Sequence, residues 1–223
     1  MTAQEQYRIP DVIREYVGGE LIIRAASERR SKQTLWIDGL KGRFVLKVAP
    51  GKDGRRALAR EKFNLEHMKP PGLLMPKVHL YLEGVRGREP VTWLLTSWLP
   101  GKPLEDWLSN GSLLSGRYDL LYRFGQALAS LHSVTVPGGD PGPGAQPPVL
   151  VHRNCTLDHV LADEEGQITG MTGWDEAGYG DPLEDLRLAT RPVPCAFLHF
   201  GDFQSFFEGY GRSPDYGFEW DRS

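Results

Sequence analysis

The residues best suited to chemistry in this chain lie in two polar segments of its second half. The first segment contains His152, Asn154 and His159, and the second is Thr172-Gly173-Trp174-Asp175. Apolar runs between and beside them predict a hairpin of two short strands. Loops that flank one hairpin bring their side chains to one place, where imidazole, amide and carboxylate groups can transfer protons or bind metal ions.

Cys155 lies inside the first segment and offers two further kinds of chemistry. With His159 it would supply two ligands of a soft-metal site such as zinc, which normally has four. As a nucleophile it would lie near His152 or His159, but no oxyanion site or orienting group accompanies it. The expected interpretation is that Cys155 fills an ordinary loop position.

A lysine and a glutamate in the first half of the chain form a second candidate pair. The helix predicted over residues 55–68 places Glu61 on the same face as Leu58. A carboxylate on an apolar face needs a cationic partner, and Lys47, on a predicted strand, is the natural candidate. Spacing leaves two possibilities open, a Lys47–Glu61 ion pair or two solvent-exposed charges.

The surrounding sequence predicts mainly strands in its first part and mainly helices in its second. The expected strands are 21–23, 34–38, 43–48, 77–82, 91–96, 160–162 and 167–172, and the expected helices are 11–17, 55–68, 119–133, 181–188 and 203–210. Residues 25–33 are expected to form a polar, basic hairpin loop, and residues 83–90 a second loop. Prolines and a glycine in residues 97–104 end the strand-rich part, so we place a boundary between residues 1–98 and 99–223.

The bulk composition indicates an ordinary globular protein. The chain has 223 residues, of which 40% are hydrophobic and 25% charged, with a net charge of −3; this excludes a general nucleic-acid binder. No apolar run approaches the length of a membrane span, and the N-terminal residues lack the apolar centre of a signal peptide. Cys155 and Cys195 suggest no disulfide framework. We expect a cytoplasmic protein that binds neither nucleic acid nor membrane.

In their order and spacing, these motifs resemble those of the aminoglycoside phosphotransferase family, a branch of the protein-kinase-like fold. The most specific part is LVHRNCTLDHVL followed by ITGMTGWDEAGYGDPLEDL, where family members read H-G-D-x-x-x-x-N, then I-D-W or I-D-F, then G-D-P-x-x-D-L. SWLPGKPL resembles the family's hinge, and ALASLH resembles the helix before the reaction loop. The resemblance implies an α+β, two-lobe fold. Residues 1–98 would form an N-lobe of antiparallel sheet plus helix, and residues 99–223 a mostly helical, shortened C-lobe.

The resemblance also implies a nucleotide site, with ATP or another nucleotide as its ligand. Lys47 and Glu61 match the pair that positions nucleotide phosphates in kinases. Val45, on the strand of Lys47, and Ser97 and Trp98, in the hinge, are implied to contribute to the same site. The hairpin segment AASERRSKQ lacks the glycine expected where backbone approaches the phosphates.

The reaction loop keeps the motif histidine, His152, and departs from the family at the three positions that matter for phosphoryl transfer. Asn154 stands where the family has the aspartate that receives or orients the substrate's hydroxyl proton, and loss of a general base costs about 10²–10⁴ in rate. His159 and Gly173 stand where the family has its metal-binding asparagine and aspartate. Because imidazole is a poor ligand for Mg²⁺ and glycine offers none, Mg²⁺ binding of the usual kind is not expected.

Nearby acidic residues could compensate or could serve the fold alone. Asp158 and Asp175 could hold a metal if the loop backbone shifted, whereas the alternative is that Asp175 and Glu176 cap or brace the following loop. Asp181 and Asp185 match acidic positions that usually support the lobe.

The favoured hypothesis is a pseudokinase that binds a nucleotide, a small molecule or a protein partner without efficient phosphoryl transfer. One alternative is an active ATP-dependent small-molecule phosphotransferase that uses displaced acidic residues, and another is a scaffold that binds no nucleotide. Relatives usually carry further helices on the acceptor side, so the acceptor region is expected to be reduced. Aromatic residues near the end could form a partner surface or pack the last helices: Phe203, Phe206, Phe207, Tyr210, Tyr216, Phe218 and Trp220.

Overall fold

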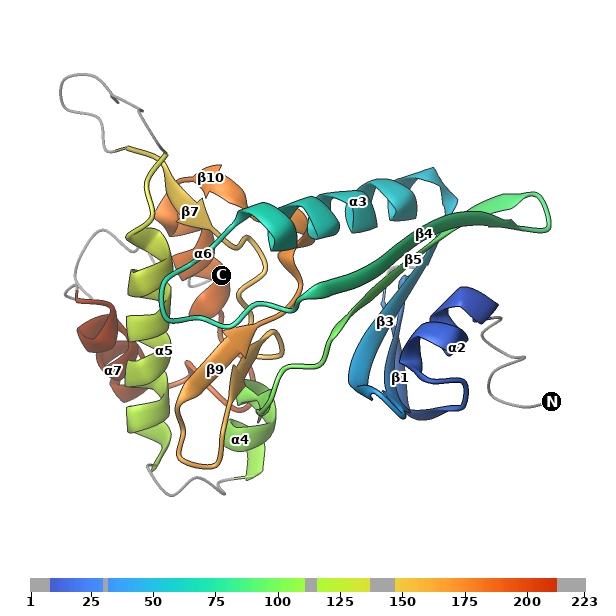
Figure 1. Cartoon of the computed structure of the whole chain (residues 1–223). Coiled ribbons are helices and arrows are strands. Elements are labelled where there is room, and N and C mark those ends of the chain that lie inside the picture. Colours follow the sequence, from blue (N-terminus) through green and yellow to red (C-terminus); the bar gives the residue numbers. More distant parts are fainter. Residues whose placement is uncertain (1–8, 30–31, 111–115, 137–146, 212–223) are drawn as a thin grey trace. The chain divides into compact units, whose positions relative to one another are not determined.

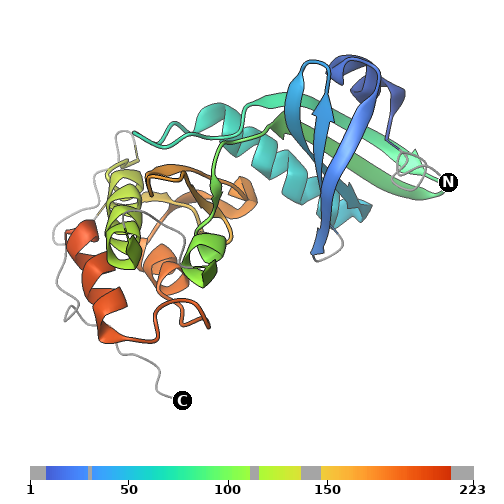
Figure 2. The ribbon, with the colours of Figure 1, turned by 90° about the horizontal axis from the view of Figure 1, so that it is seen from below.

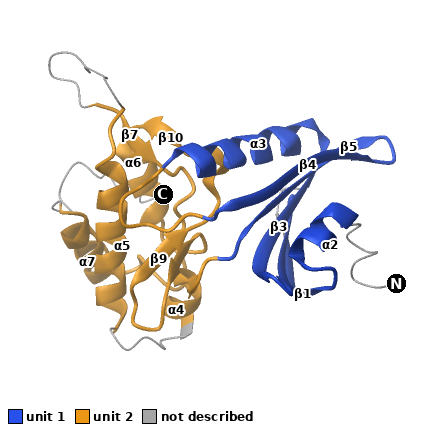
Figure 3. Ribbon diagram, viewed as in Figure 1, with its two compact units in different colours: residues 1–68, 76–98 blue, residues 69–75, 99–223 orange. Residues whose placement is uncertain are grey.

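The computed structural model of the chain describes residues 9–29, 32–110, 116–136 and 147–211, and it divides into two compact units (Figure 3). The first unit comprises residues 1–68 and 76–98, and the second comprises residues 69–75 and 99–223. Residues 69–75 therefore differ from the expected assignment to the first lobe. They pack with the second unit because Leu74 bridges to Gly170 there.

The first unit is built on an antiparallel sheet with the strand order β1-β2-β3-β5-β4 (Figure 1). Its strands are β1 (Leu21–Arg29), β2 (Lys32–Gly39), β3 (Gly42–Pro50), β4 (Val78–Arg86) and β5 (Glu89–Ser97). Leu40 and Lys41 form the expected tight turn between β2 and β3.

Two expected loops of this sheet are largely strand. β1 continues to Arg29 and pairs with β2 through the segment predicted as a hairpin loop. β4 and β5 likewise extend across the predicted loop, leaving only Gly87 and Arg88 between them. Both predictions were wrong for one reason: backbone pairing satisfies the N–H and C=O groups of a strand whatever the polarity of its side chains.

Helices α2 (Asp11–Val17) and α3 (Gly51–His67) cover opposite faces of the sheet (Figure 2). Phe44, Leu46 and Val48 of β3 are buried in one core with residues of α2. Ala49 is buried in a second core with Leu58 of α3. Successive strand residues point to opposite faces, so Lys47 shares the face of Ala49 and points toward α3.

The second unit combines helices with short strands. Its helices are α4 (Leu104–Asn110), α5 (Gly116–His132), α6 (Pro182–Ala189) and α7 (Phe200–Tyr210), with a 3₁₀ turn η1 (Trp174–Glu176). One small sheet has the order β6-β8-β9, from β6 (Lys102–Pro103), β8 (Val160–Ala162) and β9 (Ile168–Met171), and β7 (Val149–Val151) pairs with β10 (Gly178–Gly180). The predicted hairpin of the reaction loop is β8–β9.

Helices α5 and α7 pack against each other and form the core of this unit (Figure 1). Four apolar side chains of α5 are fully buried, as are Phe206 and Phe207 of α7; those of α5 are Leu121, Phe124, Leu128 and Leu131. The aromatic side chains of α7 therefore serve mainly as core, and the prediction of a partner surface was wrong for those that are buried. Residues Tyr216, Phe218 and Trp220 lie outside the described residues.

Within the described part of the chain, no helix combines the length and the apolar character needed to cross a membrane.

Candidate functional site

Lys47 and Glu61 form an ion pair inside the first unit. The Lys47 Nζ donates to Glu61 Oε1, with the Glu61 side chain 1% exposed and that of Lys47 16% exposed. Glu61 lies on the buried face of α3 with Leu58 and Leu65, as the periodicity predicted. The ion-pair alternative is therefore confirmed, and the alternative of two solvent-exposed charges is wrong. A cationic group is thus held in place on β3 by a buried carboxylate.

Val45, Ser97 and Trp98 lie near one another in the sheet of the first unit. Val45 is half-buried on β3, where its carbonyl accepts a bond from Thr96 Oγ1 at 3.5 Å. The backbone N–H of Ser97 donates to the carbonyl of Lys77, and that of Trp98 donates to the carbonyl of Arg43 at 3.3 Å. These two amides already have partners within the unit. A hydrogen bond from either amide to the base of a nucleotide would have to compete with its existing backbone hydrogen bond.

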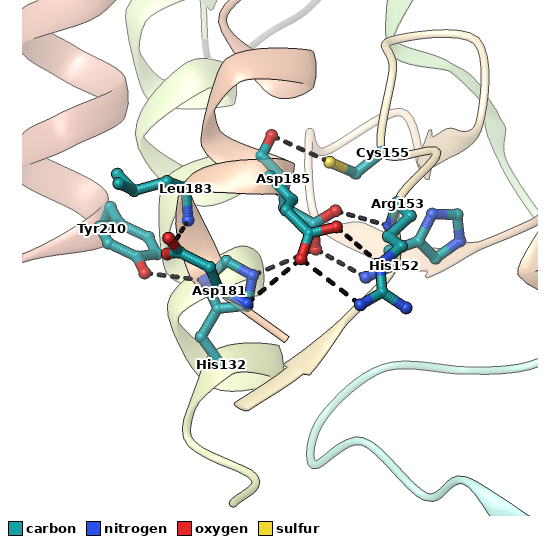
Figure 4. Close-up of polar contacts among 9 residues, drawn as sticks. His132, His152, Arg153, Cys155, Asp181, Leu183, Asp185 and Tyr210 are labelled. Carbon is teal, nitrogen blue, oxygen red and sulfur yellow. Dashed lines mark hydrogen bonds and ion pairs between the residues drawn. The ribbon is translucent and has the colours of Figure 1, made fainter. Parts of the chain in front are cut away.

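In the second unit, Asp185 organises the backbone of the reaction loop (Figure 4). Its side chain is fully buried on α6, and its two oxygens accept the backbone amides of His152 and Arg153, each at 2.6 Å. His132 of α5 approaches the same carboxylate through Nε2 at 3.1 Å, and its Nδ1 lies 2.7 Å from the Tyr210 hydroxyl. One carboxylate thus links the loop to three helices.

The charge of Asp185 is stabilised by these contacts. Burial on its own would raise the pKa of Asp185, but the hydrogen bonds from His132 and from the amides of His152 and Arg153 outweigh it. The pKa of the Asp185 carboxyl therefore lies below its ordinary value. An ionised, fully buried carboxylate is a strong acceptor, so it fixes the loop backbone firmly.

Helix α6 begins with Asp181 as its N-cap and Pro182 in the first helical position. Asp181 Oδ1 accepts the amide of Leu183 at 2.9 Å, and Glu184 accepts the amide of Asp181 in return at 3.2 Å. This capping box sets the start of the helix that carries Asp185.

The three positions that depart from the family motif lie together. Gly173 has a left-handed backbone with φ of 81°. A Cβ atom there would lie 3.0 Å from the Asn154 amide nitrogen and 3.0 Å from His159 Nδ1. Both distances are shorter than ordinary van der Waals contact. Asn154 and His159 therefore fill the space in which a side chain at position 173 would begin.

The residues at these positions do not fit a Mg²⁺ ion of the family's kind. Mg²⁺ requires oxygen ligands in near-octahedral geometry, whereas position 173 offers no side chain and position 159 offers an imidazole. Thr172 Oγ1 lies 3.3 Å from His159 Nδ1, so this ring is engaged with a neighbouring hydroxyl.

The two acids considered as replacement ligands are placed differently. Asp158 accepts the hydroxyl of Thr156 at 2.5 Å and lies 3.8 Å from His159 Nε2. Asp175 is buried within η1. Across the residues that the structure describes, no group of three or more His, Cys, Asp or Glu side chains is arranged to hold a metal.

Cys155 has a structural position. Its thiol is fully buried and donates to the backbone carbonyl of Asp185 at 3.2 Å. Burial raises the pKa of the thiol well above its ordinary value, and the nearby Asp185 charge adds to this effect. Since a thiolate is the form that attacks or binds metal, this environment disfavours the nucleophile and zinc alternatives.

His152, the motif histidine, is also buried. Its ring packs edge-on against Trp174, with the ring centroids 4.5 Å apart. The motif histidine thus joins the reaction loop to η1 by packing.

Sequence reasoning missed three residues of this site, namely Arg153, His132 and Tyr210. Arg153 stands where the family motif has glycine, and that substitution was a visible signal. The helix of His132 was recognised, but a histidine in its last turn gives no sign of its partner. Tyr210 was grouped with the aromatic residues near the end of the chain. The contact of its hydroxyl with His132 depends on tertiary packing, so the sequence gives no sign of it.

Comparisons with known proteins concern the family and the fold. The sequence matches the phosphotransferase enzyme family over residues 22–144 and 139–222. The fold is similar to that of a thermostable mutant of aminoglycoside phosphotransferase APH(4)-Ia, solved in a ternary complex with ADP and hygromycin B. The TM-score is 0.56 and the identity 16%, covering 80% of this chain and 74% of that chain. A search of curated proteins gave no match. The predicted α+β, kinase-like fold is confirmed, and at this identity the likeness concerns the fold alone.

Proposed function

Because this chain belongs to the phosphotransferase enzyme family, we propose that it is a non-catalytic member, a pseudokinase that binds a nucleotide without efficient phosphoryl transfer. The carrying observation is that Asn154, His159 and Gly173 converge on one point. The base position and both metal positions of the family motif have changed together at a single place.

The chemistry of these three residues supports the loss of transfer. Phosphoryl transfer relies on metal ions to neutralise developing charge and on a residue that orients or deprotonates the acceptor hydroxyl. The Asn154 amide has no basicity, Gly173 supplies no ligand, and His159 is a poor ligand for Mg²⁺. Such losses are not additive, yet each acts against the same reaction.

The Lys47–Glu61 pair supports nucleotide binding as the remaining activity. Glu61 holds the Lys47 ammonium in place, and an ammonium can contact phosphate oxygens without a metal ion. ADP is the nucleotide bound by the structural neighbour APH(4)-Ia, so ADP and ATP are the first ligands to test. We therefore propose binding that does not require Mg²⁺.

Calorimetry with ATP, ADP and GTP, each with Mg²⁺ and with EDTA, tests this proposal. The expected result is binding of at least one nucleotide with the same affinity in both conditions. The matched variant is Lys47→Met combined with Glu61→Leu, which removes the cation and leaves no buried unpaired carboxylate; it should fold and lose the binding. ATP turnover with a small-molecule alcohol, dependent on Mg²⁺ and lost in this variant, would contradict the proposal. No binding of any nucleotide, with a protein partner co-purified, would favour a scaffold instead.

Restoration of the family motif gives a second test. The triple variant Asn154→Asp, His159→Asn, Gly173→Asp should gain Mg²⁺-dependent nucleotide binding that the natural chain lacks. His159→Asn must be included because the imidazole occupies the space that a side chain at position 173 needs. If the triple variant folds, binds nucleotide and still ignores Mg²⁺, the explanation based on these three positions is wrong.

A further inference from the structure

Arg153 has an unusual backbone at the start of the reaction loop. Its φ is 59°, in the left-handed region that residues other than glycine seldom adopt. The peptide on the N-terminal side of Arg153 cannot relax freely, because the amide of Arg153 and that of the preceding His152 are both bound to Asp185. A residue in this conformation persists where its surroundings determine it strongly, and the next residue along the chain is Asn154.

The Arg153 side chain ties the loop to the elements that follow it in sequence. Its Nε donates to Glu184 Oε2 at 2.6 Å, and Nη2 donates to Glu184 Oε1 at 3.4 Å. Nη2 also donates to the carbonyl of Tyr179 at 3.1 Å, and Nη1 to that of Glu176 at 3.4 Å. The planar fork of a guanidinium suits this set of acceptors, and a lysine could not reproduce it.

Two glycines of β10 make room for this guanidinium. A Cβ atom at Gly178 would lie 2.7 Å from Arg153 Nη1, and one at Gly180 would lie 2.5 Å from Nη2. Real Cβ atoms do not approach other atoms so closely. A side chain at either glycine would therefore displace the end of the Arg153 side chain.

We propose that Arg153 is a positioning residue: its clamp on Glu184 and the β10 region holds Asn154 against Gly173 and His159 without a metal ion. The family motif has its metal-binding residues at positions 159 and 173, where this chain has His159 and Gly173. In this chain an ionic side-chain contact holds this region instead. The hydrogen bond from Arg153 lowers the pKa of Glu184, so the pair stays charged across the neutral range. The inference concerns the free protein and does not depend on nucleotide binding.

The test is NMR of the full chain without ligand, observing the side-chain amide of Asn154 and the hydrogen exchange of loop amides. Arg153→Gly keeps the left-handed backbone at no cost but removes the clamp. It should broaden the Asn154 signals and speed exchange of the loop amides by about tenfold, while the thermal midpoint changes little. Arg153→Lys and Glu184→Gln should produce the same effect, because each weakens the charged fork.

A second clamp in the same unit supplies the matched control. Arg117 donates to both oxygens of the buried Asp202, at 2.7 and 2.6 Å, and to the carbonyl of Cys195. Arg117→Lys should lower the thermal midpoint and leave Asn154 unchanged. Narrow Asn154 signals in Arg153→Gly would overturn the proposal, as would equal broadening in Arg117→Lys. Neither result would affect the calorimetric test of nucleotide binding, because the NMR experiment is done without ligand.

Discussion

In the first unit a buried ion pair is intact, whereas in the second unit the backbone frame of the reaction loop is intact and, in our proposal, its reactive side chains are replaced. Lys47 and Glu61 are in contact. Asn154 and Gly173 differ from the family motif with which they were compared, yet their loop is held by Asp185 and by the β8–β9 hairpin.

The two units differ in this way because Glu61 is buried more deeply than Asn154 and His159. The Glu61 side chain is 1% exposed, so removal of Lys47 would leave its carboxylate charge unpaired in a low-dielectric core. Folding therefore constrains this pair even in a protein with no nucleotide to bind. Asn154 and His159 are only partly buried, and the amide of Asn154 carries no charge. The Lys47–Glu61 contact is therefore weaker support for nucleotide binding than the convergence of Asn154, His159 and Gly173 is for the proposed loss of phosphoryl transfer.

The largest expected effect comes from removing the carboxylate that frames the loop. Asp185→Ala should lower the free energy of unfolding by about 3–5 kcal/mol, because two backbone amides and His132 lose their shared buried acceptor. Urea unfolding followed by fluorescence measures the change. A loss below about 1 kcal/mol would mean that Asp185 does not hold the frame.

Acid should release the same contact. The pKa of Asp185 is lowered in the folded state, so its stabilisation is fully present above the unfolded value of about 4 and is lost as pH falls through the lower folded value. Unfolding measured from pH 6 to pH 2 should show the wild-type chain converging on Asp185→Asn at the acid end. A constant gap between the two proteins over this range would contradict the assignment.

Breaking the pair in the first unit should have the next largest effect. Lys47→Ala should cost about 3 kcal/mol, because Glu61 would remain buried without its cation. Urea unfolding of the Lys47→Met, Glu61→Leu variant provides the comparison, with an expected change within about 1 kcal/mol. Equal losses in the two variants would show that packing, and not the unpaired charge, sets the cost.

The sequence predicted more of the backbone than of the side-chain contacts. The face of Glu61, the N-cap at Asp181 and the strand of residues 160–162 follow from periodicity and local rules, and the structure contains them. The extension of β1 to Arg29 does not follow from such rules, because it depends on pairing with a partner strand. The clamp of Arg153 depends on a positive φ and on two distant glycines, which residue type alone does not reveal.

A smaller effect on stability is expected at Gly173, beside which the side chains of Asn154 and His159 lie. Gly173→Ala should cost about 1–3 kcal/mol, since its Cβ would press on Asn154 and His159 and its backbone is left-handed. In a His159→Ala background the same change should cost about 0.5–1 kcal/mol less, because one of the two contacts is gone. Urea unfolding of the four proteins in this cycle measures the coupling. Additive losses would mean that His159 does not fill the space at position 173.

The smallest effect separates the two aspartates of the G-D-P-x-x-D-L segment. Asp181 is exposed and caps α6 through the amide of Leu183 at 2.9 Å, whereas Asp185 is buried. Asp181→Ala should therefore cost only about 1 kcal/mol, and Asp181→Asn almost nothing, because an amide oxygen caps a helix as well as a carboxylate does. Urea unfolding of both variants measures this. A cost for Asp181→Ala that matched Asp185→Ala would mean that the start of α6, and not the buried carboxylate, fixes the reaction loop. The start of α6, and not Asp185, would then explain why the loop backbone is kept although its side chains differ from the family motif.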